Sequence, residues 1–153
     1  SPLALAFIGD GVYELMVREQ IVCAGNCGVK SLHSRTVAEV RCEAQAEAVR
    51  RLQPDLERMA QVVPQWGLVP TAQGEDCDFV SRYFDPRDAV AEDPVTGSAH
   101  CTLAPFWAAR LGKQTLTARQ LSRRGGTLRC TLQGDRVSIG GNAVLYLEGT
   151  LHV

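Results

Sequence analysis

The sequence lacks any apolar run approaching the roughly 20 residues that cross a bilayer. It also lacks an excess of one charge, because sixteen basic and seventeen acidic residues leave a net charge of −1. This balance argues against a dominant electrostatic interaction with nucleic acid or with an anionic membrane. The apolar opening has no basic region before it and meets Gly9-Asp10 too soon for a signal peptide. The first residue is serine, which indicates a trimmed or incomplete chain.

Paired cysteine motifs are also missing, although the chain has six cysteines. They are scattered without a CxxC pair: Cys23, Cys27, Cys42, Cys77, Cys101 and Cys130. Cys23 and Cys27 are followed by His33, but a zinc site would need a fourth ligand, and none lies nearby. A chain of 153 residues can bury a core without disulfides. We therefore expect free thiols, no bound metal and a reducing, cytoplasmic location.

The first third of the chain has helical periodicity. Leu5, Ile8 and Val12 begin an apolar stripe that predicts a helix over residues 3–23. Gly25 and Gly28 end this helix, and a second stripe predicts another helix over residues 31–52. A third, short helix is expected over residues 55–63, after the proline at position 54.

Beyond residue 64 the pattern shifts towards strands. We predict strands over residues 67–71 and 78–84, a loop over 85–96 and a helix over 97–111. That helix is apolar almost all round, so it should be surrounded by protein. Short strands follow from residue 114, with turns at 124–126, 134–135 and 140–142. The predicted fold class is α+β: a helical N-terminal segment, then a buried central helix wrapped by antiparallel strands.

One segment combines several features of a small-anion site. Asp93-Pro94 approaches in an extended conformation, because the residue before proline avoids the helical region. Thr96-Gly97-Ser98 then lies where the buried helix begins, so free backbone N–H groups, two hydroxyls and the positive end of the helix dipole converge. A substrate carboxylate would fit there. An ordinary helix cap made by Thr96 or Ser98 is the alternative.

The same segment resembles the PhzF-like isomerase family. Asp78–Phe84, Glu92–Cys101 and Arg124-Gly125-Gly126 occur in the order and spacing typical of that family, and the resemblance extends from about residue 45 to the C-terminus. It implies the C-terminal half of a diaminopimelate-epimerase-like fold over residues 46–153. The implied activity is isomerisation or epimerisation of a small carboxylate-bearing metabolite by proton transfer, without a cofactor.

The resemblance also implies roles for individual residues. Asp93 and Ser98 would be catalytic, holding and polarising the substrate. The implied substrate-binding residues are Thr96, Gly97, Ala99, His100 and Arg124. A packing role for His100 and a solvated turn position for Arg124 are the alternatives. The family's acid/base glutamate belongs to an N-terminal domain that this sequence does not contain, so we expect a half-site that binds rather than an active enzyme.

Residues 1–45 resemble a different family. The run Leu3–Leu15, with Leu32-His33 and Ala44-Gln45-Ala46, is similar to the start of Mini-ribonuclease III. That resemblance implies magnesium-dependent cleavage of double-stranded RNA, with Asp10 and Glu14 one helical turn apart as metal ligands. Two carboxylates on one helix are too few for this chemistry, so RNA cleavage is the alternative function.

The two resemblances meet around residues 43–47, which indicates a chimera of two unrelated proteins. A third alternative is a non-catalytic chimera that folds. We expect a homodimer, because both families favour one.

Overall fold

A computed structural model describes residues 2–25, 27–62 and 67–151, and it describes side chains for these residues except 2–10 and 42. The described part begins with four helices: α1 (Pro2–Cys23), α2 (Val29–Val40), α3 (Cys42–Arg51) and α4 (Leu56–Val62). Two strands, β1 (Thr71–Gln73) and β2 (Phe79–Ser81), precede the helix α5 (Gly97–Leu111). Three strands follow: β3 (Thr115–Gln120), β4 (Gly126–Gln133) and β5 (Arg136–Gly140). None of the described helices is long and apolar enough to cross a membrane.

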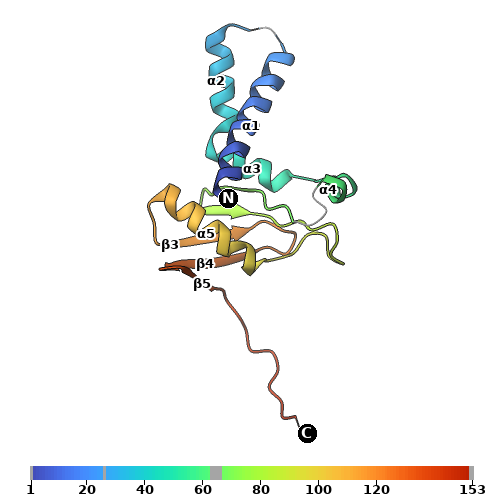
Figure 1. Ribbon diagram of the computed structural model, residues 1–153, viewed down its shortest axis with the longest axis vertical. Coiled ribbons are helices and arrows are strands. Elements are labelled where there is room, and N and C mark those ends of the chain that lie inside the picture. Colours follow the sequence, from blue (N-terminus) through green and yellow to red (C-terminus); the bar gives the residue numbers. More distant parts are fainter. Residues whose placement is uncertain (1, 26, 63–66, 152–153) are drawn as a thin grey trace.

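The helices α1 and α2 form an antiparallel hairpin that projects from the rest of the molecule (Figure 1). The extent of α1 confirms the predicted first helix. The predicted continuous helix over residues 31–52 is wrong, because Arg41 has an extended backbone, with φ −69° and ψ 159°. This break lets α2 pack on α1 while α3 turns onto the sheet.

The helix α4 confirms the predicted short third helix within the described residues. The backbone amide of Arg58 donates to Asp55 Oδ1 at 2.9 Å, so the Asp55 side chain satisfies one of the free amides at the start of the helix.

The five strands form one sheet in the order β1-β2-β3-β4-β5. All neighbours are antiparallel except β2 and β3, which are parallel, with Phe79 opposite Ala118. The predicted antiparallel strands are confirmed for three of the four neighbouring pairs, and the parallel pair β2–β3 was not predicted. The connection from β2 to β3 contains α5, and a crossover through a helix returns the chain to run parallel to the strand it left.

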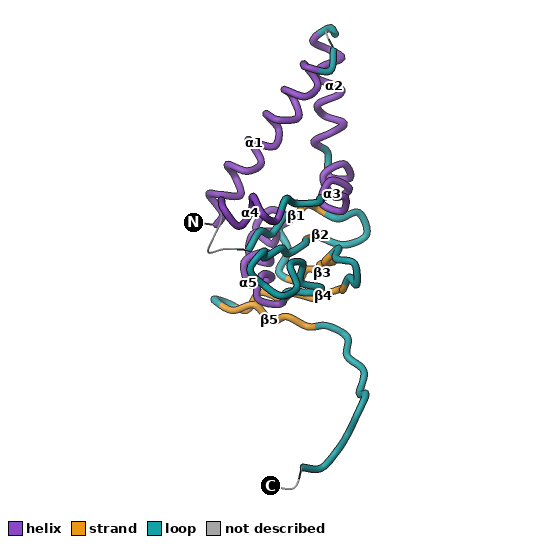
Figure 2. Tube along the Cα trace, turned by 90° about the vertical axis from the view of Figure 1, so that its right-hand side faces the viewer, coloured by secondary structure: helices purple, strands orange, loops and turns teal. Residues whose placement is uncertain are grey.

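The helix α5 covers one face of the sheet (Figure 2). Its Ala104 and Trp107 side chains pack with Phe79 and Leu116 in the main core. Gly112 ends the helix at φ 65°, the left-handed conformation favoured by glycine. The predicted bounds of this helix are confirmed.

The prediction that protein surrounds α5 is wrong. Cys101, Pro105 and Ala109 are exposed at a spacing of four residues, so one side of the helix faces away from the sheet. These small or weakly polar residues made the helix look apolar all round, but only the opposite stripe is covered.

The helix α3 lies on the other face of the sheet, where Ala46 and Val49 pack against Ala72 and Val80. The sheet is thus covered by α5 on one face and, at its β1 edge, by α3 on the other.

The described chain beyond β5 leaves the sheet instead of adding a strand to it. Residues 141–151, called the tail from here on, extend away from the sheet without helix or strand (Figure 1). A strand needs a hydrogen-bonded neighbour, and no described segment lies alongside the tail.

Candidate substrate-binding site

The segment that precedes α5 is attached to the end of β2. Phe84 forms isolated bridges with both Leu68 and Glu92, so the chain that returns after the loop lies beside the strand it left. The Asp93 amide donates to the Tyr83 carbonyl at 3.1 Å. These backbone contacts fix the position of Asp93 before the helix begins.

A buried glutamine holds the turn between Asp93 and Thr96. Gln120 Oε1 accepts the Thr96 amide at 2.8 Å, and Gln120 Nε2 donates to the Asp93 carbonyl at 2.7 Å. The residue is only 1% exposed. We did not predict Gln120 as a site residue; its sequence signal is a polar residue in step with the buried Leu116 and Ala118 of the same strand.

Thr96 does not cap α5. Its hydroxyl instead donates to Asp93 Oδ2 at 2.6 Å, and no side chain at the cap position accepts from the first helical amides. The backbone amides of the first turn therefore have no intrahelical acceptor and no Thr96 oxygen. The predicted alternative of an ordinary cap made by Thr96 is wrong.

The first turn of α5 is open to solvent. Gly97 and Ser98 are exposed, and a Cβ placed on Gly97 would meet no atom within 4 Å. The positive end of the helix dipole thus faces free space with unsatisfied donors around it. An anion could approach this turn without displacing protein.

His100 lies in the core beneath this turn rather than at the surface. The side chain is fully buried, its ring centroid is 5.7 Å from that of Phe79, and its Nδ1 is 2.8 Å from the Thr96 carbonyl oxygen. Nδ1 therefore carries the proton and donates. Burial lowers the pKa of His100, against the opposing effect of the Thr96 carbonyl. The neutral ring supports the helix start from below.

Arg124 belongs to the turn that borders the site on the other side. Ser122 Oγ donates to the Pro94 carbonyl at 2.7 Å and accepts the Gly125 amide at 3.0 Å. The exposed Arg124 lines a cavity of about 500 Å³ with Glu92, Pro94 and Arg123. This cavity places two cations beside Pro94, in the segment that leads to α5.

The structure thus brings several predicted residues together and leaves others apart. Hydrogen bonds connect Asp93, Thr96 and His100 through Gln120 and the Thr96 backbone. Among the residues the structure describes, no hydrogen bond joins Ser98 or Arg124 to this group. The arrangement can present amides, one hydroxyl and one carboxylate to a small acid that arrives from solvent.

The predicted acidic pair in α1 is only partly described. Asp10 lies outside the residues with described side chains, and Glu14 accepts from Arg18 Nη2 at 2.5 Å. Within the described side chains, no three His, Cys, Asp or Glu residues gather as metal ligands do. Glu14 is therefore engaged by a neighbouring cation on its own helix.

The chain is similar in sequence to proteins of one family. A family model described as phenazine biosynthesis-like protein, PhzC-PhzF, matches residues 31–149. An uncharacterized isomerase of Pseudomonas aeruginosa is 54% identical over 107 residues, covering 70% of this chain and 41% of that protein. A human phenazine biosynthesis-like domain-containing protein is 51% identical over 92 residues, covering 56% of this chain and 32% of that protein.

A solved structure is also similar. The PhzF-family phenazine biosynthesis protein from Enterococcus faecalis matches with a TM-score of 0.63 and 43% identity. The match covers 70% of this chain and 41% of that one. The chain therefore spans about two fifths of the length of these bacterial relatives.

Proposed function

Because the chain belongs to the PhzC-PhzF family of phenazine biosynthesis-like proteins, we propose that its residues 46–153 are the carboxylate-binding half of a cytoplasmic isomerase. The full enzyme would shift a proton at carbon in a small carboxylate-bearing metabolite, without a cofactor. The isomerase relative from Pseudomonas aeruginosa supports this reaction class. A separate helical segment over residues 1–45 would precede this half.

The observation that carries the proposal is the uncapped first turn of α5. Thr96 turns its hydroxyl to Asp93, so the amides of the first turn remain available to a carboxylate. The exposed Ser98 hydroxyl would add a donor, and Gly97 leaves room for close approach. Ala99 would contribute its amide.

Asp93 would act on the substrate beside the bound carboxylate. The Thr96 hydroxyl holds its Oδ2, which orients the carboxylate and leaves Oδ1 for the reacting group. Arg124 would attract the anion to the turn, and His100 would act by holding the Thr96 carbonyl in place. The glutamate base that the family resemblance implies lies outside this chain, so the chain alone should bind without turnover.

Protein NMR during titration with small carboxylic acids tests the proposal. We expect saturable shifts of the amides of residues 97–99 at millimolar acid, and no shifts with the corresponding carboxamides, because only a charged oxygen pair matches the free amides. Ser98→Ala should weaken the binding, whereas Ser138→Ala, an exposed serine in β5, should not. Unchanged amides at residues 97–99 would sink the proposal.

The alternative, RNA cleavage by a Mini-ribonuclease III-like segment, stays a prediction. Incubation of the chain with duplex RNA and magnesium tests it, and Asp10→Asn is the variant that must abolish any cleavage observed. The ion pair between Glu14 and Arg18 does not favour this function, because it occupies one of the two expected metal ligands.

A further inference from the structure

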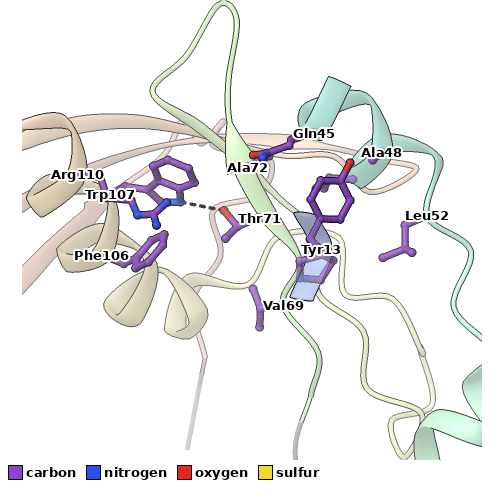
Figure 3. Close-up of a pocket in the computed structure, with 12 residues that line it drawn as sticks. Tyr13, Gln45, Ala48, Leu52, Val69, Thr71, Ala72, Phe106, Trp107 and Arg110 are labelled. Carbon is purple, nitrogen blue, oxygen red and sulfur yellow. Dashed lines mark hydrogen bonds between the residues drawn. The ribbon is translucent and has the colours of Figure 1, made fainter. Parts of the chain in front are cut away.

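We propose that the tail of one copy of this chain inserts, as an added strand, into a groove at the β1 edge of a second copy. The inference concerns assembly and does not rest on the proposed function. The groove is a cavity of about 400 Å³ formed between α3, β1 and α5, with Tyr13 of α1 at its side (Figure 3). We call it the edge groove.

The edge groove has the shape of a strand site. The strand β1 is an edge of the sheet, because among the described strands only β2 pairs with it. Ala48 of α3 and Leu52, directly after that helix, form one wall, and α5 contributes Phe106 and Trp107 to the other (Figure 3). An exposed sheet edge between two apolar walls is a template for an incoming extended segment.

Alternate residues of β1 present backbone hydrogen-bonding groups to the edge groove. Ala72 pairs with Val80, and the Pro70 carbonyl accepts from the Arg82 amide, so positions 70 and 72 direct their backbone towards β2. Alternate residues of an antiparallel strand direct their backbone to opposite sides. The backbone of Val69 and Thr71 therefore faces the free edge, where an added strand would pair.

The tail has the composition that the groove requires. Five of its apolar side chains are 80–97% exposed: Val144, Leu145, Tyr146, Leu147 and Leu151. Exposed apolar side chains on an extended segment indicate a segment that another surface covers.

The charges of the tail and of the edge groove are complementary. Glu148 is the only charged residue of the tail. Arg110, which stacks over the Phe106 ring at 4.6 Å, is the only charged residue among the described residues that line the groove. A strand seated along β1 with Glu148 towards Arg110 would bring opposite charges together.

The reach and the direction of the tail point to the groove of a second copy. The tail leaves β5 at one edge, and the groove lies at β1 on the opposite edge, four strand spacings or about 19 Å away. The chain from Gly140 to Val144 spans at most about 14 Å. The start of the apolar run at Val144 therefore cannot reach the groove of its own chain, and the tail leaves the sheet on the side away from β1 (Figure 2). Two copies can instead exchange tails about a twofold axis.

Charge reversal in the full chain tests this exchange. We expect a dimer by sedimentation equilibrium, with the dissociation constant raised about tenfold by either Glu148→Arg or Arg110→Glu. The variant with both reversals should return the dissociation constant towards the original value, because the pair is restored with opposite polarity. Asp135→Arg, an exposed charge in the β4–β5 turn, is the matched control and should leave the dimer unchanged.

Isotope-filtered NMR identifies whose tail fills the groove. In a mixture of labelled and unlabelled copies, we expect filtered contacts between Tyr146 of one copy and Trp107 of the other. A monomeric chain would overturn the proposal. So would tail contacts that appear in the uniformly labelled protein but vanish in the filtered experiment, because the groove would then hold the tail of its own chain.

Discussion

Gln120 spans the turn before α5 from one end to the other, accepting an amide from Thr96 and donating to the carbonyl of Asp93. One side chain thus provides the hydrogen-bond partner of both backbone groups. An aliphatic residue of similar size would leave them without a partner, and an unmade hydrogen bond inside a protein costs more than a made one contributes.

We predict that Gln120→Leu lowers the free energy of unfolding by about 2–4 kcal/mol, because two backbone groups lose their partner. Urea denaturation measures the change. Gln133→Leu at the exposed end of β4 is the control and should change stability by less than about 0.5 kcal/mol. Equal effects of the two substitutions would contradict the bridging role.

His100 predicts a dependence of stability on pH. Its pKa is lowered in the folded state by burial, so below its ordinary value of 6.5 the unfolded chain takes up a proton that the folded chain refuses. The unfolded state binds more protons, and stability falls as pH decreases from about 6.5, by at most about 1.4 kcal/mol per pH unit. Above that pH both states are neutral and the effect is absent.

Thermal unfolding between pH 7.5 and 5 checks this expectation. His100→Gln should flatten the slope, whereas His33→Gln, at an exposed position, should leave it as it is. Hydrogen bonds from Arg87 lower the pKa of Asp85, and the stability linked to that carboxylate is lost only as pH falls below about 3.8, outside this range. A slope that survives in His100→Gln would refute the assignment.

The sequence predicted the residues of the motif before α5, but not the distant side chain that hydrogen-bonds to its backbone. Asp93 and Thr96 were predicted from the motif itself, and the structure places them in contact. Gln120 lies 24 residues from Thr96, so its contact depends on strand pairing that local spacing does not reveal. His100 was expected in the substrate site or in packing, and it lies in the core.

The start of α5 depends on the packing of the segment before it against β4. Gly126 lies directly under Val95, and a Cβ placed on that glycine would be only 2.3 Å from Val95 Cγ2. The contact holds the motif down on the sheet, so a larger residue in β4 would push the motif outward.

We predict that Gly126→Ala destabilises the protein by about 1–3 kcal/mol, because the overlap forces Val95 or the strand to move. It should also shift the amide resonances of residues 95–99. The second substitution Val95→Ala should recover part of the loss by removing the overlapping methyl group. Gly97→Ala is the control without a steric conflict, and it should not destabilise the helix.

Elements were predicted best where their pattern is local. The bounds of α5 follow from its apolar run and from Gly112, and α1 follows from its periodicity. The break at Arg41 was not predictable from the apolar stripe of residues 31–52. It occurs where the chain passes from α2, which packs on α1, to α3, which packs on the sheet, and these are tertiary contacts. The parallel pairing of β2 and β3 depends on the path of the crossover, which short strand patterns do not encode.

Arg82 connects the end of α3 with the segment that precedes α5. Its guanidinium donates to the carbonyls of Val49, Arg50 and Leu52 at the end of α3, while Nε pairs with Glu92 at 2.7 Å. The side chain is 11% exposed. A single cation thus satisfies the free carbonyls of one helix and the carboxylate that precedes Asp93.

We predict that Arg82→Met costs about 3–5 kcal/mol, because it leaves Glu92 and the end of α3 without their partner. Hydrogen exchange should then accelerate in residues 42–52, together with the segment 92–99. Arg51→Gln is the matched control and should cost less than about 1 kcal/mol, since Arg51 forms an exposed pair with Glu47. Faster exchange in residues 42–52 with unchanged exchange in 92–99 would show that Arg82 does not couple them.

At the scale of the whole molecule, a mixed α/β arrangement was predictable, because helical periodicity gives way to strand patterns along the chain. The unpaired tail was not predictable, because strand formation depends on a neighbour, and the tail has none within the described part of its own chain. The proposed division at residues 45–46 remains a prediction, and the tight contact of α3 with β1 and β2 lies just beyond it.

The parallel pairing of β2 with β3 also governs the order in which this protein folds. The Asp78 side chain accepts a hydrogen bond from the Thr117 amide, 39 residues away. This part of the sheet must therefore lose the entropy of closing a long loop before its contacts can form. Closure of this kind is slow compared with the formation of a hairpin such as β4–β5. The turn between Asp93 and Thr96 lies inside that loop, and Gln120 of β3 binds it from the far strand. Refolding should therefore restore the β4–β5 hairpin first and ligand binding in the slowest kinetic phase.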